Sequence, residues 1–154
     1  MTMSRTLEFR RAGPQDAARI RDLTCKAYAK WCAVIGREPK PMTADYDHAV
    51  RHHVIDLACI AGRLVGLVEM ISREDDLLIE NVCVDPDEQG AGLGKRLIAH
   101  AEEETRKRGH AVIRLYTNKL FAANLRFYGG LGYEVEHEEP FMGGTTVHFR
   151  KSLR

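Results

Sequence analysis

The first part of the chain carries apolar residues at the spacing of a helix. One set recurs every three or four positions: Ala17, Ile20, Leu23, Ala27, Trp31 and Val34. This spacing places the set on one helical face, which predicts burial in a core and makes Trp31 a core residue. Pro14 suits the first turn of such a helix and Gly36 its end. A short strand is expected before it, at residues 6–10.

A loop rich in proline follows at residues 36–42, and beyond it the pattern favours a second helix and then strands. Thr43 offers a hydroxyl that could cap a short helix ending near His53. From residue 57 onward, apolar runs at 57–61, 64–71 and 77–84 are separated by short polar turns. Short turns join antiparallel neighbours, so these runs predict a meander of three strands.

A strand, a helix and a further strand are expected after residue 77. A helical stripe through Leu93, Leu97, Ile98 and Ala101 ends at Gly109 and is followed by an apolar run at 112–117. Because the helix forms a crossover, the strand after it should lie parallel to 77–84. A last helix at 120–128 and strands at 133–137 and 145–150 complete the chain. The expected fold class is α/β (α+β), with a mixed, mostly antiparallel twisted sheet of six to seven strands, one parallel βαβ unit and about four helices.

Composition narrows the class of protein. The 154 residues fit a single domain, 1–154, and a formal net charge of +1 gives no reason to expect nucleic acid as a partner. No apolar run has the length of a membrane span and the start lacks a secretory signal, so we expect a cytoplasmic protein without a membrane partner. The four cysteines form no C-x-x-C pair, and His48, His52 and His53 lack the other parts of a zinc motif. No metal is therefore expected.

The glycine-rich stretch before the helix at 93 predicts an anion site. Gly90, Gly92 and Gly94 let backbone amides converge on one point, and the positive end of a helix lies beside them. A dinucleotide fingerprint would need a third glycine at Lys95. A P-loop would need glycine at Gln89 and a hydroxyl at position 96. The stretch fits neither pattern. A phosphate group remains the expected ligand.

Three segments resemble the Gcn5-related N-acetyltransferase (GNAT) family. Gln89 to Gly94 reads Q-x-x-G-x-G, similar to the family's pyrophosphate loop [RQ]-x-x-G-x-[GA]. Upstream, Val82 to Pro86 resembles its V-x-P strand end. Downstream, Asn124 to Tyr133 is similar to its N-x-x-F-Y-x-x-L-G-[FY] segment. The resemblance is strong over residues 77–137 and loose before them.

The resemblance implies a site for acetyl-CoA between two parallel strands that splay apart, with a bulge in the strand 77–84. The implied cofactor-binding residues are Val82, Cys83, Val84, Gln89, Gly90, Ala91, Gly92, Leu93, Gly94, Lys95, Asn124 and Tyr128. The backbone of the strand would hold the pantetheine arm like an added strand. The family transfers acyl groups directly and a thiol in an apolar strand is usually inert, so Cys83 is not expected to act as a nucleophile.

Acyl transfer to an amine needs an oxyanion donor, a base for the amine and a proton for the leaving thiolate. Tyr128 matches the family's acid, and a phenol is suited to protonating a thiolate. The amide of Val84 is the candidate oxyanion donor. Glu80 alternates with Leu78 and Val82, which would place its carboxylate beside the acyl site as the base. Glu69 and His137 remain alternatives.

The expected function is an N-acetyltransferase that uses acetyl-CoA and a primary amine of a small molecule or peptide. Two other functions stay open: an acyl-CoA-binding sensor or subunit without turnover, and a protein N-terminal acetyltransferase. By the resemblance, the acceptor should lie against residues 36–42 and 138–144, and a homodimer is possible.

Overall fold

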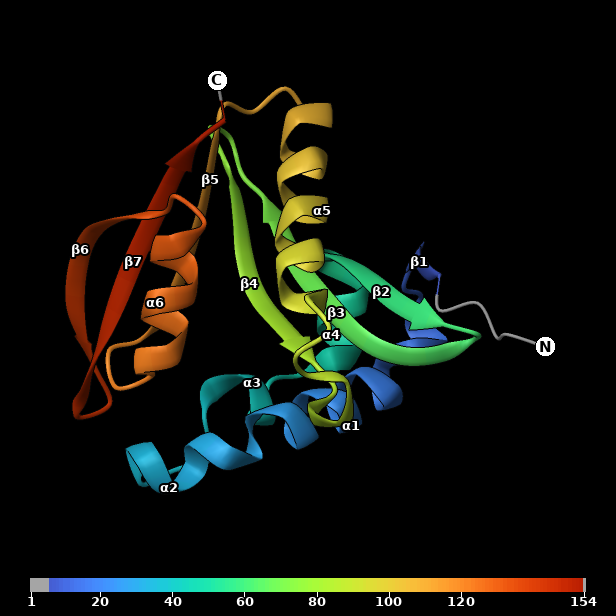
Figure 1. The fold of residues 1–154 in the computed structure, drawn as a ribbon, viewed down its shortest axis with the longest axis horizontal. Coiled ribbons are helices and arrows are strands. Elements are labelled where there is room, and N and C mark those ends of the chain that lie inside the picture. The colour runs from blue at the N-terminus through green and yellow to red at the C-terminus, as the bar shows by residue number, and fades with distance from the viewer. Residues whose placement is uncertain (1–5, 154) are drawn as a thin grey trace.

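The computed structural model describes residues 6–153, and in this part of the chain seven strands form one sheet (Figure 1). The strands are β1 (Leu7–Arg11), β2 (Val54–Ile60), β3 (Arg63–Ser72), β4 (Leu77–Val84), β5 (Val112–Asn118), β6 (Glu134–Phe141) and β7 (Gly144–Ser152). Their order across the sheet is β1-β2-β3-β4-β5-β7-β6. Neighbours are antiparallel except β4 and β5, which are parallel. The expected fold class is confirmed.

Helices cover both faces of the sheet. They are α1 (Ala17–Tyr28), α2 (Cys32–Ile35), α3 (Lys40–Thr43), α4 (Tyr46–His52), α5 (Leu93–Lys107) and α6 (Ala122–Gly130). One core joins the sheet to α5 and α6, with Leu97 and Ile98 fully buried in it. A second core joins the opposite face to α1 and α4 through Ile20 and Tyr46. None of the helices within residues 6–153 is both long enough and apolar enough to cross a bilayer.

The N-terminal helical region is more divided than the sequence predicts. A 3-10 turn at Pro14–Asp16 precedes α1, and a second at Ala29–Trp31 separates α1 from α2. Gly36 ends α2 in the left-handed region at φ 72°, as expected. The N-cap of α4 is Asp45, and not Thr43 as predicted. The Asp45 carboxylate accepts a hydrogen bond from the His48 amide at 3.1 Å. The described residues therefore contain more helical segments than the four expected.

The last strands are longer than predicted. β6 continues through Pro140 to Phe141, so residues 138–141 are strand and not loop. Met142 (φ 47°) and Gly143 (φ 79°) make a tight hairpin turn to β7, in which both central residues are left-handed. β6 is an edge strand of the sheet, where a proline is tolerated because the side without a neighbouring strand needs no amide donor.

Two irregularities open the middle of the sheet. Asn81 pairs with Glu69 and Ile79 with Met70, so Glu80 has no partner on β3 and forms a bulge. On its other side, β4 pairs with β5 only over Leu77 to Ile79. Beyond that point the two strands diverge, as Figure 1 shows. The splay and the bulge implied by the resemblance are both present.

The turn from β3 to β4 is held by Asp76, and its removal should destabilise the fold. The buried carboxylate accepts from Arg73 Nε at 2.7 Å and from Arg114 Nη1 at 2.7 Å. We expect Asp76→Asn to lower the free energy of unfolding at neutral pH by about 2 kcal/mol, because two charged donors lose their carboxylate. The exposed neighbour Asp75 provides the matched control, Asp75→Asn.

The effect of Asp76 should depend on pH. The Arg73 hydrogen bond, with Arg114, lowers the pKa of Asp76 in the folded chain. The contribution of Asp76 to stability is therefore full above its pKa in the unfolded chain, about 3.9. It is lost as the pH falls through the lower pKa of the folded chain. Urea unfolding at neutral pH and near pH 3 should show the gap between Asp76→Asn and wild type narrowing in acid. Equal losses for Asp76→Asn and Asp75→Asn would contradict this role.

Candidate functional site

The edge of β4 that faces the splay offers free backbone groups. The Asp85 amide donates to Val65 O on β3 at 2.8 Å. Because amides alternate in direction along a strand, those of Val84 and Val82 point the other way, toward the gap beside β5. An extended ligand could pair with this edge as an added strand. The geometry supports the sequence-based choice of Val84 as an amide donor.

The glycine loop lies between β4 and α5. Gly90 (φ 88°) and Gly92 (φ 75°) both adopt the left-handed region, and Gly92 is the N-cap of α5. The first amides of a helix lack acceptors within the helix. In α5 the Arg96 amide donates to Gly92 O at 3.2 Å, so the amides before it have no acceptor of this kind. The first turn contains no acid and instead carries the exposed cations Lys95 and Arg96. Cations are unfavourable at a helix N-terminus unless an anion binds there.

Some of the loop's side chains face away from any ligand. Leu93 is buried in the core of the α5 face, so its contribution to a ligand is limited to its amide. Gln89, Gly90 and Ala91 are exposed. A Cβ on Gly94 would lie 3.3 Å from Phe127 Cζ, which explains why a residue without a side chain stands between α5 and α6.

Substituting Gly92 should weaken CoA binding. An alanine at φ 75° costs about 1–2 kcal/mol, and relief of this strain would turn the loop amides away from a diphosphate. We expect Gly92→Ala to raise the dissociation constant of CoA about tenfold, measured by calorimetry. Gly129→Ala is the control, because a Cβ on Gly129 in α6 meets no atom within 4 Å. Equal CoA affinities for the two variants would overturn the loop's assignment.

A cavity of about 130 Å³ lies where the loop, β4 and α6 meet, and is called the β4 cavity below. It is lined by Ala27, Tyr28, Lys30, Trp31, Val82, Cys83, Val84, Gln89, Gly94, Asn124, Phe127 and Tyr128. The structure therefore brings together seven residues selected from the sequence, from β4, the glycine loop, α5 and α6. They are Val82, Cys83, Val84, Gln89, Gly94, Asn124 and Tyr128.

Tyr128 is the titratable group best suited to chemistry in the β4 cavity. The residue is 7% exposed, and within residues 6–153 its hydroxyl makes no hydrogen bond. Burial raises the pKa of Tyr128 above the usual value of a phenol, so the group stays protonated at neutral pH. A hydroxyl that lines a cavity and has no partner in the described part of the chain is free to bind a ligand group.

Two other residues of the β4 cavity have clear structural partners. Cys83 is buried beside Thr24, 3.8 Å from its Oγ1, and burial raises the pKa of the thiol to about 12. The thiolate is therefore scarce at neutral pH, as expected for an inert cysteine. Asn124 Nδ2 donates to Thr117 Oγ1 at 3.2 Å and so ties α6 to β5.

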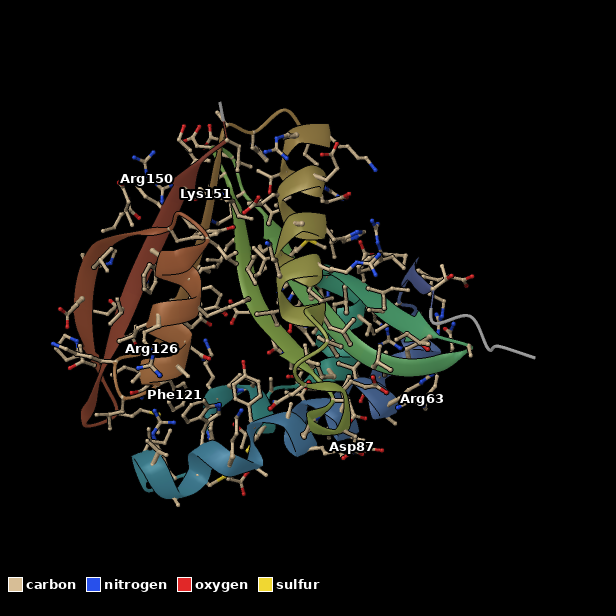
Figure 2. The ribbon with its side chains drawn as sticks, in the orientation of Figure 1. Arg63, Asp87, Phe121, Arg126, Arg150 and Lys151 are labelled. Atoms are coloured by element: carbon tan, nitrogen blue, oxygen red, sulfur yellow. The ribbon has the colours of Figure 1, made fainter. Side chains whose placement is uncertain are left out.

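Sequence reasoning missed the aromatic wall of the β4 cavity. Trp31 is half-buried and lines the cavity, so its assignment to the core was wrong. It stacks on Phe121, with ring centroids 4.3 Å apart. Figure 2 shows Phe121 between α6 and the N-terminal helices. The 3-10 turn after α1 moves Trp31 away from the buried face of that helix. The apolar periodicity of the sequence did not indicate this turn.

Glu80 lies at the bulge, on a different face from the one predicted. Val82 packs in the core of the α5 face, whereas Glu80 points to the opposite face, because the bulge interrupts the alternation between them. Its Oε1 accepts from Tyr116 Oη at 2.6 Å and lies 3.4 Å from Lys40 Nζ. The predicted alternation with Val82 was wrong, and the carboxylate instead borders two hollows beside β5.

Of the two alternative bases, only Glu69 lies near Glu80. The two carboxylates line one hollow, called the Glu69 hollow. Glu69 is buried 2.5 Å from His53 Nδ1, and burial raises the pKa of its carboxyl group. His137 is exposed on β6 and stacks on His148 at 4.2 Å.

The ring of His137 also takes part in a potential metal cluster on β6 and β7. His137, Glu139 and His148 hold ligand atoms within 4.8 Å of one another. The Glu139 carboxylate already accepts a hydrogen bond from His148 at 2.6 Å. Its negative charge therefore has a partner without a metal ion.

A larger hollow of about 280 Å³, called the β5 hollow, opens beside the β4 cavity. It is lined by Tyr28, Ile35, Arg37, Pro39, Lys40, Pro41, Glu80, Tyr116, Thr117, Asn118, Phe121, Glu139, Phe141, Thr146 and His148. Residues 36–42 and 138–144 both contribute, as the resemblance implied for an acceptor. Tyr28 and Phe121 come close to both spaces, and Tyr28 lines both of them.

Solved structures with this architecture include several acetyltransferases. A GCN5-related N-acetyltransferase from Rhodopseudomonas palustris superimposes with a TM-score of 0.81, at 21% identity and covering 99% of each chain. The PaiA N-acetyltransferase from Thermoplasma acidophilum in complex with coenzyme A superimposes with a TM-score of 0.79, at 17% identity, covering 93% of this chain and 98% of that one. At such identities these likenesses establish the fold.

Sequence comparison connects the chain to the same group. The ribosomal protein bS18-alanine N-acetyltransferase of Escherichia coli K12 is 39% identical over 59 residues, which are 38% of this chain and 40% of that protein. The chain thus matches less than half the length of this curated relative. A sequence profile of the acetyltransferase (GNAT) family matches residues 18–133, three quarters of the chain. The chain therefore belongs to the acetyltransferase (GNAT) family.

Proposed function

We propose that this protein transfers an acetyl group from acetyl-CoA to a primary amine of a small molecule or peptide, by direct attack of the amine on the thioester. One observation carries the proposal. Tyr128, whose hydroxyl makes no hydrogen bond within residues 6–153, lines the same cavity as Val82 and Val84 on the free edge of β4. A thioester laid along that edge would have a proton donor beside its sulfur.

The cosubstrate would be held by backbone groups. The amides of residues 90–95 and the N-terminus of α5 suit a diphosphate, and Lys95 and Arg96 add positive charge. The pantetheine arm would pair with the outward amides and carbonyls of Val82 and Val84. Binding of the diphosphate by backbone amides, and not by side chains, explains why the loop is rich in glycine.

The chemical steps use four groups of the chain. Glu80 takes a proton from the acceptor's ammonium, directly or through water, so that a neutral amine attacks the carbonyl. The Val84 amide stabilises the oxyanion of the tetrahedral intermediate. The carbon–sulfur bond then breaks, and Tyr128 gives its proton to the leaving thiolate. Asn124 holds α6, and with it Tyr128, against β5.

The N-terminus of a protein is the second candidate acceptor, favoured by one comparison. The curated relative from Escherichia coli is named for an alanine of a ribosomal protein. The β5 hollow, at about 280 Å³, has room for a small amine or for the terminal residue of a peptide. Peptides with a free N-terminus therefore belong in any acceptor panel.

A thiol-release screen with acetyl-CoA tests the proposal. The panel should contain amino acids, polyamines, aminoglycosides and peptides, with a thiol reagent reporting free CoA. Release above the amine-free rate with at least one class is the expected result. Stabilisation by CoA with no release for any class would favour a binding module without turnover.

We further propose a cytoplasmic location, where acetyl-CoA is made, and a homodimer. The edge strand β6 exposes Val135 and Phe141, which makes it a candidate contact between two copies. Light scattering of the purified chain should give twice the monomer mass. A monomer at all concentrations would remove the dimer from the account.

A further inference from the structure

The β5 hollow already contains one primary amine, that of Lys40. Its Nζ lies 3.4 Å from Glu80 Oε1 and 3.4 Å from Tyr116 Oη. The same nitrogen is 5.6 Å from the centre of the Tyr116 ring. An acceptor amine that gives its proton to Glu80 needs this same position, within reach of the carboxylate. Lys40 therefore occupies the place of a substrate amine.

The segment that carries Lys40 is fixed by contacts on both sides. Pro39 and Pro41 flank the lysine, and Pro39 is buried. Tyr46 Oη donates to Pro41 O at 2.6 Å, and Cys25 Sγ to Met42 O at 3.5 Å. These contacts anchor α3 to α1 and α4, so the backbone of Lys40 is held close to Glu80. Only the flexible stem of the side chain remains free to move.

We propose that Lys40 is a self-acetylation site, modified by the chain's own acetyl-CoA; the inference rests on the proposed function. Glu80 takes a proton from the Lys40 ammonium, and the freed lone pair forms a nitrogen–carbon bond to the acetyl carbonyl. The carbon–sulfur bond breaks, the thiolate takes a proton from Tyr128, and the second proton that the nitrogen loses as the amide forms returns through water to Tyr128. The products are Nε-acetyl-Lys40, free CoA and the proton that Glu80 passes to solvent.

The contacts of Lys40 favour reaction within one molecule. Holding amine and base as an ion pair 3.4 Å apart removes the entropy cost of bringing an acceptor to the site. The product amide is neutral and cannot keep the ion pair with Glu80. Modified Lys40 therefore leaves the carboxylate free for an external acceptor.

Lys119 is a matched control within the same chain. Its side chain is 57% exposed, as is that of Lys40, and it also pairs with a glutamate, Glu138 at 2.8 Å. It lies outside the β5 hollow. Any acetylation by acetyl-CoA in solution should affect both lysines alike, so the difference between them isolates the effect of the site.

The test is peptide mass spectrometry after incubation of the purified chain with acetyl-CoA and no added amine. Lys40 should be acetylated at least about tenfold faster than Lys119. Its first-order rate constant should not change with protein concentration. Glu80→Gln should slow Lys40 about 100-fold and leave Lys119 unchanged. Equal rates for the two lysines, or an unchanged Lys40 rate in Glu80→Gln, would overturn the proposal.

Two further measurements separate this inference from the proposed function. Lys40→Arg should abolish the Lys40 signal and keep that of Lys119, which verifies the assignment of the peptide. A good external amine should slow the modification, because both compete for Glu80. If an external amine is acetylated while Lys40 stays unmodified, self-acetylation alone fails. If no CoA binds, the proposed function itself fails.

Discussion

Tyr128→Phe should lower kcat about 100-fold while CoA affinity stays unchanged. The substitution removes the hydroxyl that would protonate the leaving thiolate and keeps the ring that packs against Tyr133 and Phe149. Because burial raises the pKa of Tyr128, the phenol is protonated through the neutral range, and wild-type activity should not fall from its ionisation below about pH 10. Thiol release measures kcat, and calorimetry measures CoA binding.

Tyr133→Phe is the matched control for this variant. Tyr133 is also buried, but its hydroxyl donates to Glu102 Oε2 at 2.8 Å, outside the β4 cavity. Removing that hydroxyl should lower the melting temperature and leave kcat near the wild-type value. An unchanged kcat in Tyr128→Phe, or equal losses in both variants, would take the acid role away from Tyr128.

Glu80→Gln should lower kcat by about 100-fold or more, because a carboxamide cannot accept the ammonium's proton. The amide oxygen still accepts from Tyr116, so the fold around the bulge should hold, which circular dichroism and melting can verify. The deficit should shrink at high pH, where a larger fraction of the acceptor amine is already neutral. A pH–rate profile with a good acceptor measures this change.

Glu69→Gln distinguishes the two carboxylates. Glu69 shares a hollow with Glu80, yet its own Oε2 is paired with His53. We expect a smaller loss of kcat here than in Glu80→Gln, together with lower stability, because a buried pair loses its charge. A larger loss of kcat in Glu69→Gln would transfer the role of base to Glu69.

The elements around the cosubstrate could be predicted from local sequence signals. The strand at 77–84 has the predicted bounds, since an apolar run lies between a polar turn and Asp85-Pro86. Gly90 and Gly92 adopt the left-handed conformations that their residue type allows. The parallel pairing of β4 and β5 follows from the helical crossover that joins them. These features depend on residues close together in the chain.

The acceptor side of the site could not be predicted in the same way. Lys40, Tyr116 and Phe121 meet near Glu80 only because α3 is anchored to α1 and α4 while β5 diverges from β4. The bulge at Glu80 reverses which face its side chain takes, and alternation gives no sign of it. β6 was truncated in the prediction because its charged residues and Pro140 resemble a loop, which an exposed edge strand tolerates.

The central claim is that the edge of β4 and the amides at the start of α5 bind coenzyme A. Isothermal titration of the purified chain with CoA tests it most directly, with thermal melting as a second readout. The account predicts one CoA bound per chain and a rise in melting temperature that increases with CoA concentration. No heat of binding and no change in melting at millimolar CoA would contradict it.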